Sequence, residues 1–260
     1  MEIKRNVVLA KYTTFRIGGK AKYFFVAKNK DEIIKAVKWA KNKNLPFFIL
    51  GGGSNLLVSD KGYRGLVIKY GIPLSSYVLK NLDWAVGIPG TIQGAVYGNA
   101  GAFGKSMEDN VKSVEVFDIK TNKIKIFKNK DCRFSYRNSV FKKNKNLIII
   151  SAKIKFQKSN PDKIKQYLNY KKDTQPLNFP SAGSIFKNPK GFTAGELVEK
   201  CGLNGKRIGD VKVSEKHANF IVNLGNGKAK DVIKLIKLIK TKVKNKFKIN
   251  LEEEIQFLGF

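Results

Sequence analysis

The spacing of apolar residues in the first third of the chain predicts alternating strands and a helix. Short apolar runs at 21–26 and 47–50 have the length of strands, and the second run is expected to be buried. Between them, apolar residues recur every three or four positions over 31–44, which gives a helix one hydrophobic face. A further apolar run at 56–58 leaves the first glycine-rich loop, and after 65–68 the pattern is less clear until Gly87. The pattern predicts a compact β-α-β unit.

The rest of the chain divides into a strand-rich middle and a mixed C-terminal part. A mostly polar helix over 160–172, with Pro161 in its first turn, is expected to connect the two. This mixture predicts an α+β fold. The middle strands are expected at 114–118, 123–127 and 147–156, and the C-terminal elements are helices at 194–201 and 228–247 and strands at 219–223 and 254–258.

Length and composition indicate a globular protein. The chain has 260 residues, of which 42% are hydrophobic, enough to bury a large core. No apolar run approaches the roughly 20 residues that a membrane span requires, and Met1–Asn6 lacks the apolar stretch of a signal peptide. Cys132 and Cys201 are far apart in sequence, which favours the reducing cytoplasm. We expect a cytoplasmic protein with no membrane contact.

The net charge of +31 raises the alternative of a basic nucleic-acid-binding protein. Only six of the 51 basic residues are arginine, the side chain that reads bases through paired hydrogen bonds. The lysines are spread along surface helices instead of gathering in one stretch. We therefore expect weak attraction to polyanions but no specific nucleic-acid partner.

Two glycine-rich segments are candidate cofactor loops. Gly51–Asn55 follows an apolar run, and Gly87–Ala95 leads into Gly98–Gly101. Backbone N–H groups approach a phosphate closely only where side chains are absent. Neither segment has the spacing of a nucleoside-triphosphate loop or of a Rossmann loop. A pair of structural turns is the alternative, but two such segments together favour a cofactor with a diphosphate.

Three side chains are candidates for the chemistry. Ser184 lies in Ser181-Ala-Gly-Ser-Ile-Phe-Lys-Asn-Pro189, where a hydroxyl among small residues could donate a proton beside an anion. Arg137 has aromatic and hydroxyl neighbours suited to a guanidinium that grips a carboxylate, or it is an ordinary surface arginine. Glu254 has apolar flanks, although a solvated strand end explains it equally well. His217 is expected to be structural, and neither a metal site nor a hydrolase triad is expected.

Seven motifs, taken in the order in which they occur, resemble the UDP-N-acetylenolpyruvoylglucosamine reductase family. The chain resembles the shorter, type II form of that family. The resemblance runs over nearly the whole chain, and seven motifs in order are far more specific than any one of them. The matching segments are TTFRIGG at 13–19, LGGGSNLLVSD at 50–60, GIPGTIQGAVYGNAGAFG at 87–104, FSYRNSVF at 134–141, QPLNFPSAGSIFKNP at 175–189, RIGDVKVSEKHANFIVN at 207–223 and LEEEIQFLG at 251–259.

The resemblance implies a two-part FAD-binding domain like that of vanillyl-alcohol oxidase, followed by an α+β substrate domain. The three parts would span 1–68, 69–158 and 159–260. It also implies non-covalent FAD, bound by the glycine loops, and a substrate held by Tyr136, Lys187 and Asn188. The implied FAD contacts are Gly51, Gly52, Gly53, Ser54, Asn55, Gly87, Pro89, Gly90, Thr91, Gly94, Ala95, Asn99, Ala100 and Gly101.

The implied reaction is an NADPH-dependent reduction in peptidoglycan precursor synthesis. NADPH reduces FAD, and the flavin passes the hydride to the enolpyruvyl ether of a UDP-sugar. Arg137 and Glu254 would stabilise the resulting enolate, and Ser184 would protonate it. The alternative within enzymes is another FAD oxidoreductase with the same cofactor domain. We expect a monomer.

Two departures from the family pattern stand out. The segment over 68–86 is shorter than usual, which is expected to affect FAD binding. Lys171–Thr174 stands where the family often has arginine and lysine before Gln175, and this difference is expected to change how the substrate diphosphate is held.

Overall fold

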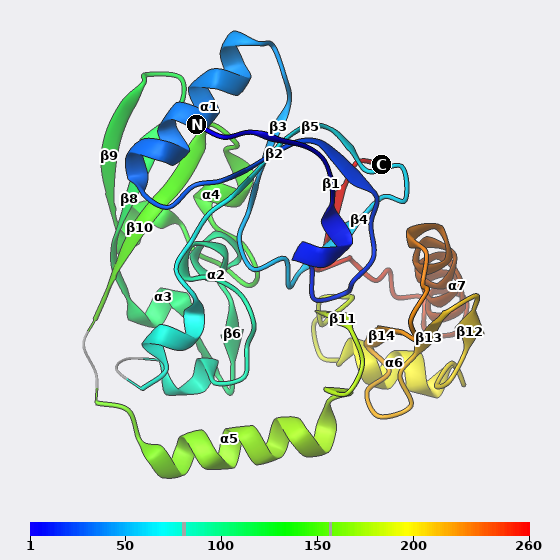
Figure 1. Ribbon diagram of the computed structural model, residues 1–260. Coiled ribbons are helices and arrows are strands. Elements are labelled where there is room, and N and C mark those ends of the chain that lie inside the picture. Colours follow the sequence, from blue (N-terminus) through cyan, green and yellow to red (C-terminus); the bar gives the residue numbers. More distant parts are fainter. Residues whose placement is uncertain (80–81, 156–157) are drawn as a thin grey trace.

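The computed structural model describes residues 1–79, 82–155 and 158–260. Its first layer is a four-stranded sheet in the order β1-β2-β5-β3, shown in blue and cyan in Figure 1. β1 is antiparallel to β2, whereas β2, β5 and β3 are parallel. The strands are β1 (Lys4–Val8), β2 (Lys20–Val26), β3 (Phe47–Leu50) and β5 (Tyr63–Lys69).

Helix α1 (Lys30–Asn42) crosses from β2 to β3 and covers one face of this sheet. Its N-terminus is capped by Asn29, whose side chain accepts a hydrogen bond from the Glu32 N–H at 3.0 Å. Ile33 and Val37 on its apolar face are fully buried. The predicted helix is therefore confirmed within two residues at either end.

The expected β-α-β unit is confirmed, since α1 joins the parallel strands β2 and β3 of one sheet, but the two strands are not adjacent. β5 lies between β2 and β3, so the two strands joined by α1 are not neighbours. β4 (Leu56–Val58) leaves the sheet and pairs in parallel with β15 (Gln256–Leu258). β3 is also less buried than predicted, because only Leu50 of its four residues is buried. The reason is that the strand borders a large cavity.

The middle of the chain forms a second, antiparallel sheet in the order β10-β8-β9. All three strands were predicted, and β10 ends at Ile154, whereas the expected end at residue 156 lies outside the described residues. Trp84 is fully buried beside this sheet. The elements of this part are β8 (Val111–Asp118), β9 (Lys123–Lys128), β10 (Leu147–Ile154), α2 (Ile92–Gly98), α3 (Met107–Asn110), α4 (Val140–Lys143), β6 (Gly101–Ala102) and β7 (Lys105–Ser106), with short 3-10 helices at Leu9–Tyr12, Leu74–Tyr77, Asp83–Ala85 and Asn129–Cys132.

The segment over 68–86, where the chain is expected to be shortened, packs into the folded core in its described residues. Leu74 and Trp84 are fully buried, and the Trp84 indole N–H donates to Asn110 Oδ1 at 3.0 Å. The start of the segment is held by Gln93, whose Oε1 accepts from the Ile72 N–H at 3.0 Å. The described residues of this segment are thus anchored to α2 and to the core around Trp84.

Helix α5 (Pro161–Thr174) connects the two halves and runs along one side of the molecule, as Figure 1 shows. Beyond it lies a sheet in the order β11-β14-β13-β12, packed against two helices. The predicted helices and the strand at 219–223 are confirmed within a few residues. The elements are β11 (Ser181–Ser184), β12 (Arg207–Ile208), β13 (Val211–Val213), β14 (Phe220–Asn223), α6 (Ala194–Lys200) and α7 (Ala229–Phe247).

The N-terminal and C-terminal halves of the chain are packed into one another. Phe15, Ile17 and Leu57 of the N-terminal half pack in the core of the C-terminal half, and β15 returns from the C-terminal end to pair with β4. The last strand begins at Gln256, so Glu254 precedes it instead of opening it as predicted. The expected boundaries at 68 and 158 therefore stay predictions. No helix within the described ranges is long and apolar enough to cross a bilayer.

Candidate active site

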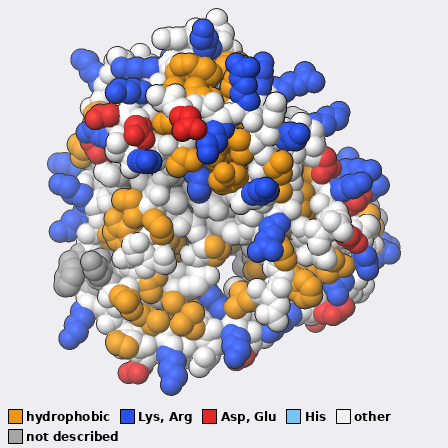
Figure 2. All heavy atoms as spheres, in the orientation of Figure 1, with side chains coloured by type: hydrophobic (Ala, Val, Ile, Leu, Met, Phe, Trp, Pro, Cys, Tyr) orange, Lys and Arg blue, Asp and Glu red, His pale blue; other side chains and the backbone are white. Residues whose placement is uncertain are grey.

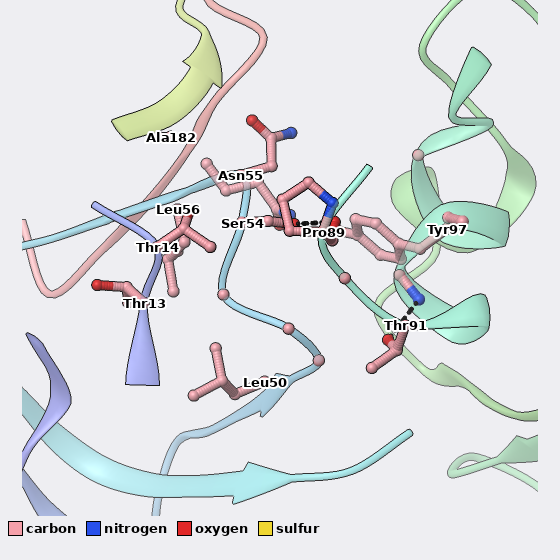
Figure 3. Close-up of a pocket in the computed structure, with 18 of the residues that line it drawn as sticks. Thr13, Thr14, Leu50, Ser54, Asn55, Leu56, Pro89, Thr91, Tyr97 and Ala182 are labelled. Atoms are coloured by element: carbon pink, nitrogen blue, oxygen red, sulfur yellow. Dashed lines mark hydrogen bonds between the residues drawn. The ribbon is translucent and has the colours of Figure 1, made fainter. Parts of the chain in front are cut away.

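The two glycine-rich segments meet in space. Ser54 Oγ donates to the Pro89 carbonyl at 2.8 Å, and Thr91 Oγ1 accepts from the Gly94 N–H at 3.2 Å; both contacts are drawn in Figure 3. A Cβ atom on Gly52 would lie 2.4 Å from the Gly90 Cα, so the backbones touch where no side chain fits. The glycines are therefore required by the contact between the loops.

This paired edge borders a cavity of about 1600 Å³ that reaches from both glycine segments to the start of β11. Ligand pockets for small molecules usually span roughly 300–1,000 Å³, so the space suits a dinucleotide together with a substrate. Thirteen of the fourteen predicted cofactor contacts line it, namely Gly51, Gly52, Gly53, Ser54, Asn55, Gly87, Pro89, Gly90, Thr91, Gly94, Ala95, Ala100 and Gly101.

Asn99 is the predicted cofactor contact that the structure places elsewhere. It is 3% exposed and caps α2 in the left-handed conformation. Its Nδ2 donates to the Ser135 carbonyl, and its Oδ1 accepts from the Glu108 N–H, both at 3.0 Å. The turn at the end of α2 directs this amide away from the cavity. Asn99 thus braces the turn that carries Arg137.

All three predicted catalytic side chains line the same cavity. The Glu254 N–H donates to the Ile185 carbonyl at 2.8 Å, which sets Glu254 directly beside the Ser184 backbone. Asn55 Nδ2 donates to the Glu254 carbonyl at 3.1 Å. A backbone bond therefore joins the chain at Glu254 to the strand of Ser184, and the Asn55 side chain ties Glu254 to the first glycine segment, although these residues are far apart in sequence.

Arg137 is held at two of its donor positions. Its Nε donates to Glu254 Oε1 at 2.7 Å and its Nη2 donates to the Gly101 carbonyl at 3.1 Å. The guanidinium carbon also lies 5.2 Å from the centre of the Tyr136 ring. Nη1 makes no hydrogen bond with the residues that the structure describes. This leaves donors free to bind an anion in the cavity.

Ser184 presents a free hydroxyl. Its Oγ makes no hydrogen bond within the described part of the chain, and the residue is partly exposed at the cavity wall. The pairing of β11 with β14 is irregular between Ser181 and Ser184, and Gly183 has φ +76°. This local bend leaves the hydroxyl open to a ligand.

Glu254 is mostly buried, and burial raises the pKa of its carboxyl above the usual range. The charge of Arg137 and its hydrogen bond oppose this rise, as do Lys142 and Lys187. We take burial as the stronger effect, since it is the largest cause. Glu254 therefore holds its proton to a higher pH than an exposed glutamate.

The three predicted substrate contacts lie together but beyond the lining of the cavity. Tyr136 Oη accepts from the Asn188 N–H at 3.2 Å. Asn188 Oδ1 accepts from the Ala194 N–H at 3.0 Å, and Lys187 forms an ion pair with Glu252. They form the rim of the site, where their assignment to the substrate stays a prediction.

Several cavity residues were missed from the sequence. Lys69, Lys142 and Lys171 line the cavity, and burial lowers the pKa of each, that of Lys171 to about 8. Lys69 has no signal in the sequence that separates it from the other basic residues, which number 51 with arginine included. Lys142 directly follows the Phe134–Phe141 motif, and Lys171 begins the segment before Gln175 that departs from the family pattern, but neither position predicted a side chain in the cavity.

The arrangement fits FAD. A side-chain-free edge, formed by two touching glycine segments, borders a cavity large enough for a dinucleotide, and Arg137, whose Nη1 has no partner among the described residues, lines the same cavity. No group of His, Cys, Asp or Glu among residues 1–79, 82–155 and 158–260 has the geometry of a metal site. Fold and site together define an FAD-dependent oxidoreductase.

Comparison with known proteins agrees with this class. Residues 21–77 match the family model described as "FAD binding domain", and residues 175–258 match "UDP-N-acetylenolpyruvoylglucosamine reductase, C-terminal domain". The chain belongs to the UDP-N-acetylenolpyruvoylglucosamine reductase family.

Individual relatives carry the same name. The reductase of Caldanaerobacter subterraneus subsp. tengcongensis is 41% identical over 98% of this chain and 93% of its own length. The reductase of Caldicellulosiruptor saccharolyticus is 41% identical over 100% of this chain and 93% of its own length. The solved structure of the Thermus caldophilus enzyme superposes with a TM-score of 0.85 at 31% identity, covering 99% of both chains.

The alignment with the Caldicellulosiruptor relative spans 289 positions, although this chain has 260 residues. That relative therefore carries residues that this chain lacks. The site of the shortening, expected over 68–86, stays a prediction.

Proposed function

We propose that this protein reduces the enolpyruvyl ether of a UDP-N-acetylglucosamine to the lactyl ether of UDP-N-acetylmuramate, consuming one NADPH and one proton. The observation that carries this proposal is the convergence of Ser184, Arg137 and Glu254 at one end of a cavity that both glycine segments line. When bound, FAD supplies the carrier that accepts a hydride from NADPH and delivers it to the substrate.

Arg137 provides the charge that this reaction needs. Hydride addition at the β-carbon of the ether places negative charge on the substrate carboxylate and α-carbon. A guanidinium already oriented by Glu254 and the Gly101 carbonyl stabilises that charge without reorganising during the reaction. The free Nη1 is the atom we assign to the carboxylate.

Ser184 completes the reaction by protonating the α-carbon. A serine hydroxyl is a weak acid, but an enolate is far more basic than a carboxylate, so the transfer is downhill. The unpaired Oγ at the cavity wall is available for this role. Glu254 orients Arg137 through the hydrogen bond from Arg137 Nε to its Oε1.

Further expectations belong to the same proposal. Tyr136, Lys187 and Asn188 on the rim would bind the sugar and diphosphate of the substrate. The product would enter peptidoglycan precursor synthesis, and so support the cell wall on which cell shape and division depend. We keep the expectations of a monomer that acts in the cytoplasm and has no specific nucleic-acid partner. Lys and Arg are spread over the face in Figure 2 instead of forming one stripe, which supports the last of these.

Purified protein tests the proposal in two steps. The protein should be yellow and release free FAD on denaturation, in a ratio near one per chain. It should then oxidise NADPH in the presence of the enolpyruvyl UDP-sugar and yield a product two hydrogens heavier by mass spectrometry. Bound FAD without substrate-dependent oxidation would favour another FAD oxidoreductase, and a protein that neither contains nor takes up FAD would refute the class.

A further inference from the structure

Arg137 has a backbone conformation that its residue type rarely adopts. Its φ of +55° lies in the left-handed region, which favours glycine or asparagine. The residue occupies the corner of a tight turn, because Ser135 and Asn138 exchange backbone hydrogen bonds of 3.1 and 3.0 Å. The direction of the guanidinium therefore depends on contacts that hold this turn from outside.

Two side chains hold the turn by its carbonyl groups. Asn99 binds the Ser135 carbonyl, as described above, and the Lys142 ammonium donates to the Arg137 carbonyl at 3.1 Å. The second contact is made to Arg137 itself, at the residue with the unfavourable φ. Lys142 is thus the side chain that bonds directly to the strained position.

Lys142 reaches this carbonyl from a well-anchored helix. α4 is a single turn whose Phe141 is fully buried. Its N-cap residue Ser139 donates from Oγ to the Tyr97 carbonyl at 2.7 Å and accepts from the Lys142 N–H at 3.4 Å. The base of the lysine side chain is therefore fixed relative to the cavity.

We propose that Lys142 is a positioning residue for the reduction, which holds the turn at 135–138 so that the Arg137 guanidinium faces the substrate carboxylate. This inference rests on the proposed function. Lys142 does not need to contact the substrate, because its contact is with the backbone of the residue that does. Nor do we expect it to act in the reduction of FAD by NADPH.

The charge of Lys142 supports the same role. The carboxylates of Glu254 and Glu252 and the ammonium groups of Lys187 and Lys145 are the charged groups that face it. Burial lowers the pKa of Lys142, and Lys187 lowers it further, whereas the two glutamates raise it. A cation in this place also adds to the positive potential at the end of the cavity where negative charge develops.

Replacement of Lys142 by methionine tests the proposal, since Lys142→Met keeps an unbranched side chain one atom shorter and removes the donor and the charge. A misplacement of about 1 Å costs on the order of 10²-fold in rate, so we expect a loss of that size in the rate of substrate reduction. The KM should change much less than kcat. Reduction of the bound FAD by NADPH, followed separately by stopped flow, should keep the wild-type rate.

Two further variants separate positioning from general damage. Lys143→Met changes the exposed neighbour on the same helix and should behave as wild type, with the same FAD content and melting temperature. Lys142→Arg restores a donor and a charge and should recover most of the lost kcat. If Lys142→Met folds poorly, the comparison of Lys142→Arg with the wild type still tests the proposal, because the arginine variant should keep both the fold and most of kcat.

Each result has a definite consequence. Wild-type kcat in Lys142→Met, or no recovery in Lys142→Arg relative to methionine, would overturn the proposal. Equal slowing of both half-reactions would assign Lys142 to the cofactor instead and would also overturn it. If the wild-type protein contains FAD but does not reduce the enolpyruvyl substrate at all, the proposed function itself fails, and this inference fails with it.

Discussion

Ser184 shows how a residue's role depends on the backbone around it. The strand that carries it breaks its regular pairing with β14, and the neighbouring Gly183 takes a positive φ. The hydroxyl is thereby left without a partner among the described residues and borders the cavity. A serine that was bonded in a regular strand could not serve as a proton donor.

Ser184→Ala should lower the rate of turnover by roughly 10² to 10⁴, the usual effect of losing a general acid. Bound FAD and its reduction by NADPH should be unaffected, because the hydroxyl lies at the substrate end of the cavity. The measurement is the rate of solvent deuterium incorporation at the substrate α-carbon. Ser184→Cys, which keeps an acidic proton, should retain part of the activity. An alanine variant that delivers the proton at the wild-type rate would make Ser184 a packing residue.

Lys171 is a buried cation with one described acceptor. It is 5% exposed, and its Nζ donates to the Val86 carbonyl at 2.6 Å. Its ammonium also lies 5.7 Å from the centre of the Phe103 ring. Burial lowers the pKa of Lys171 from its ordinary 10.5 to about 8. The residue thus connects helix α5 to the start of the second glycine segment. Its burial disfavours the charged form of the side chain.

This shift predicts a pH-dependent stability. Below about pH 8 Lys171 is protonated in both the folded and the unfolded chain, and burying the charge costs stability. Between about 8 and 10.5 the unfolded chain binds the extra proton, so the free energy of unfolding rises with pH through this residue. Relative to Lys171→Met, the wild type should gain up to about 1.4 kcal/mol per pH unit in that window.

Urea unfolding at pH 7, 9 and 10 measures this difference. Methionine also removes the bond to the Val86 carbonyl, but that loss shifts the variant's stability equally at every pH. Lys172→Met, at the exposed neighbouring position, should follow the wild-type pH dependence. Parallel curves for wild type and Lys171→Met would show that the ammonium remains charged in the folded protein.

At the scale of elements, one side chain joins three parts of the fold. Gln93 lies in the first turn of α2 and is 6% exposed. Its Oε1 accepts from the Ile72 N–H and its Nε2 donates to the Ile150 carbonyl, both at 3.0 Å. It therefore braces the second glycine segment against β10 and against the start of the shortened segment, and it lines the cavity.

Gln93→Leu should destabilise the protein and weaken FAD binding. The Ile150 carbonyl still accepts from the Tyr70 hydroxyl, but the Ile72 N–H loses its acceptor. Because Ile72 is 44% exposed, water can replace part of that bond, and we expect a cost of about 0.5–1.5 kcal/mol. Urea unfolding and titration of the FAD-free protein with FAD are the measurements. Gln166→Leu on the exposed side of α5 is the control. If FAD affinity is unchanged, the brace supports only the core.

The elements also mark the limit of prediction from sequence. Local apolar spacing predicted α1, β3 and the strands of the second sheet, because burial of one face leaves a periodic trace. It did not predict that β5 separates β2 from β3, or that β4 pairs with β15. Those pairings join segments about 200 residues apart in the second case, and no local pattern encodes a distant partner.

At the scale of the whole molecule, the cavity is shared by both halves. Its walls come from the N-terminal sheet, the second glycine segment, connector α5 and the start of β11. Neither half encloses it alone, because the carboxylate partner of Arg137 comes from the chain just before β15. Ligand binding should therefore couple the halves.

Removal of FAD should lower the melting temperature of the intact protein. A ligand that binds only the folded state stabilises it by about 2.7 kcal/mol at 100 times its dissociation constant. The FAD-free protein, titrated with FAD in a thermal scan, should recover stability in a concentration-dependent way. Riboflavin, which lacks the diphosphate, should recover much less because the glycine segments would have no phosphate to bind. An unchanged melting temperature would mean that FAD does not bind the folded cavity.

The sequence by itself determined the chemistry that this protein has available. The sequence was enough to identify the glycine segments, Ser184, Arg137 and Glu254 as candidates. Each lies in a local motif, so no knowledge of distant contacts was needed to find it. The sequence also determined the α+β class through its apolar spacing.

Only the tertiary structure decided which of these residues share a cavity. It placed Asn99 in a supporting turn and left Tyr136, Lys187 and Asn188 outside the cavity lining. It also brought Lys142 to the Arg137 carbonyl. These outcomes depend on the pairing of distant strands and on side-chain burial. Strand pairing and burial are properties of the assembled core and have no local signature in the sequence. Lys142 differs from the other basic residues only in its neighbours in the folded structure.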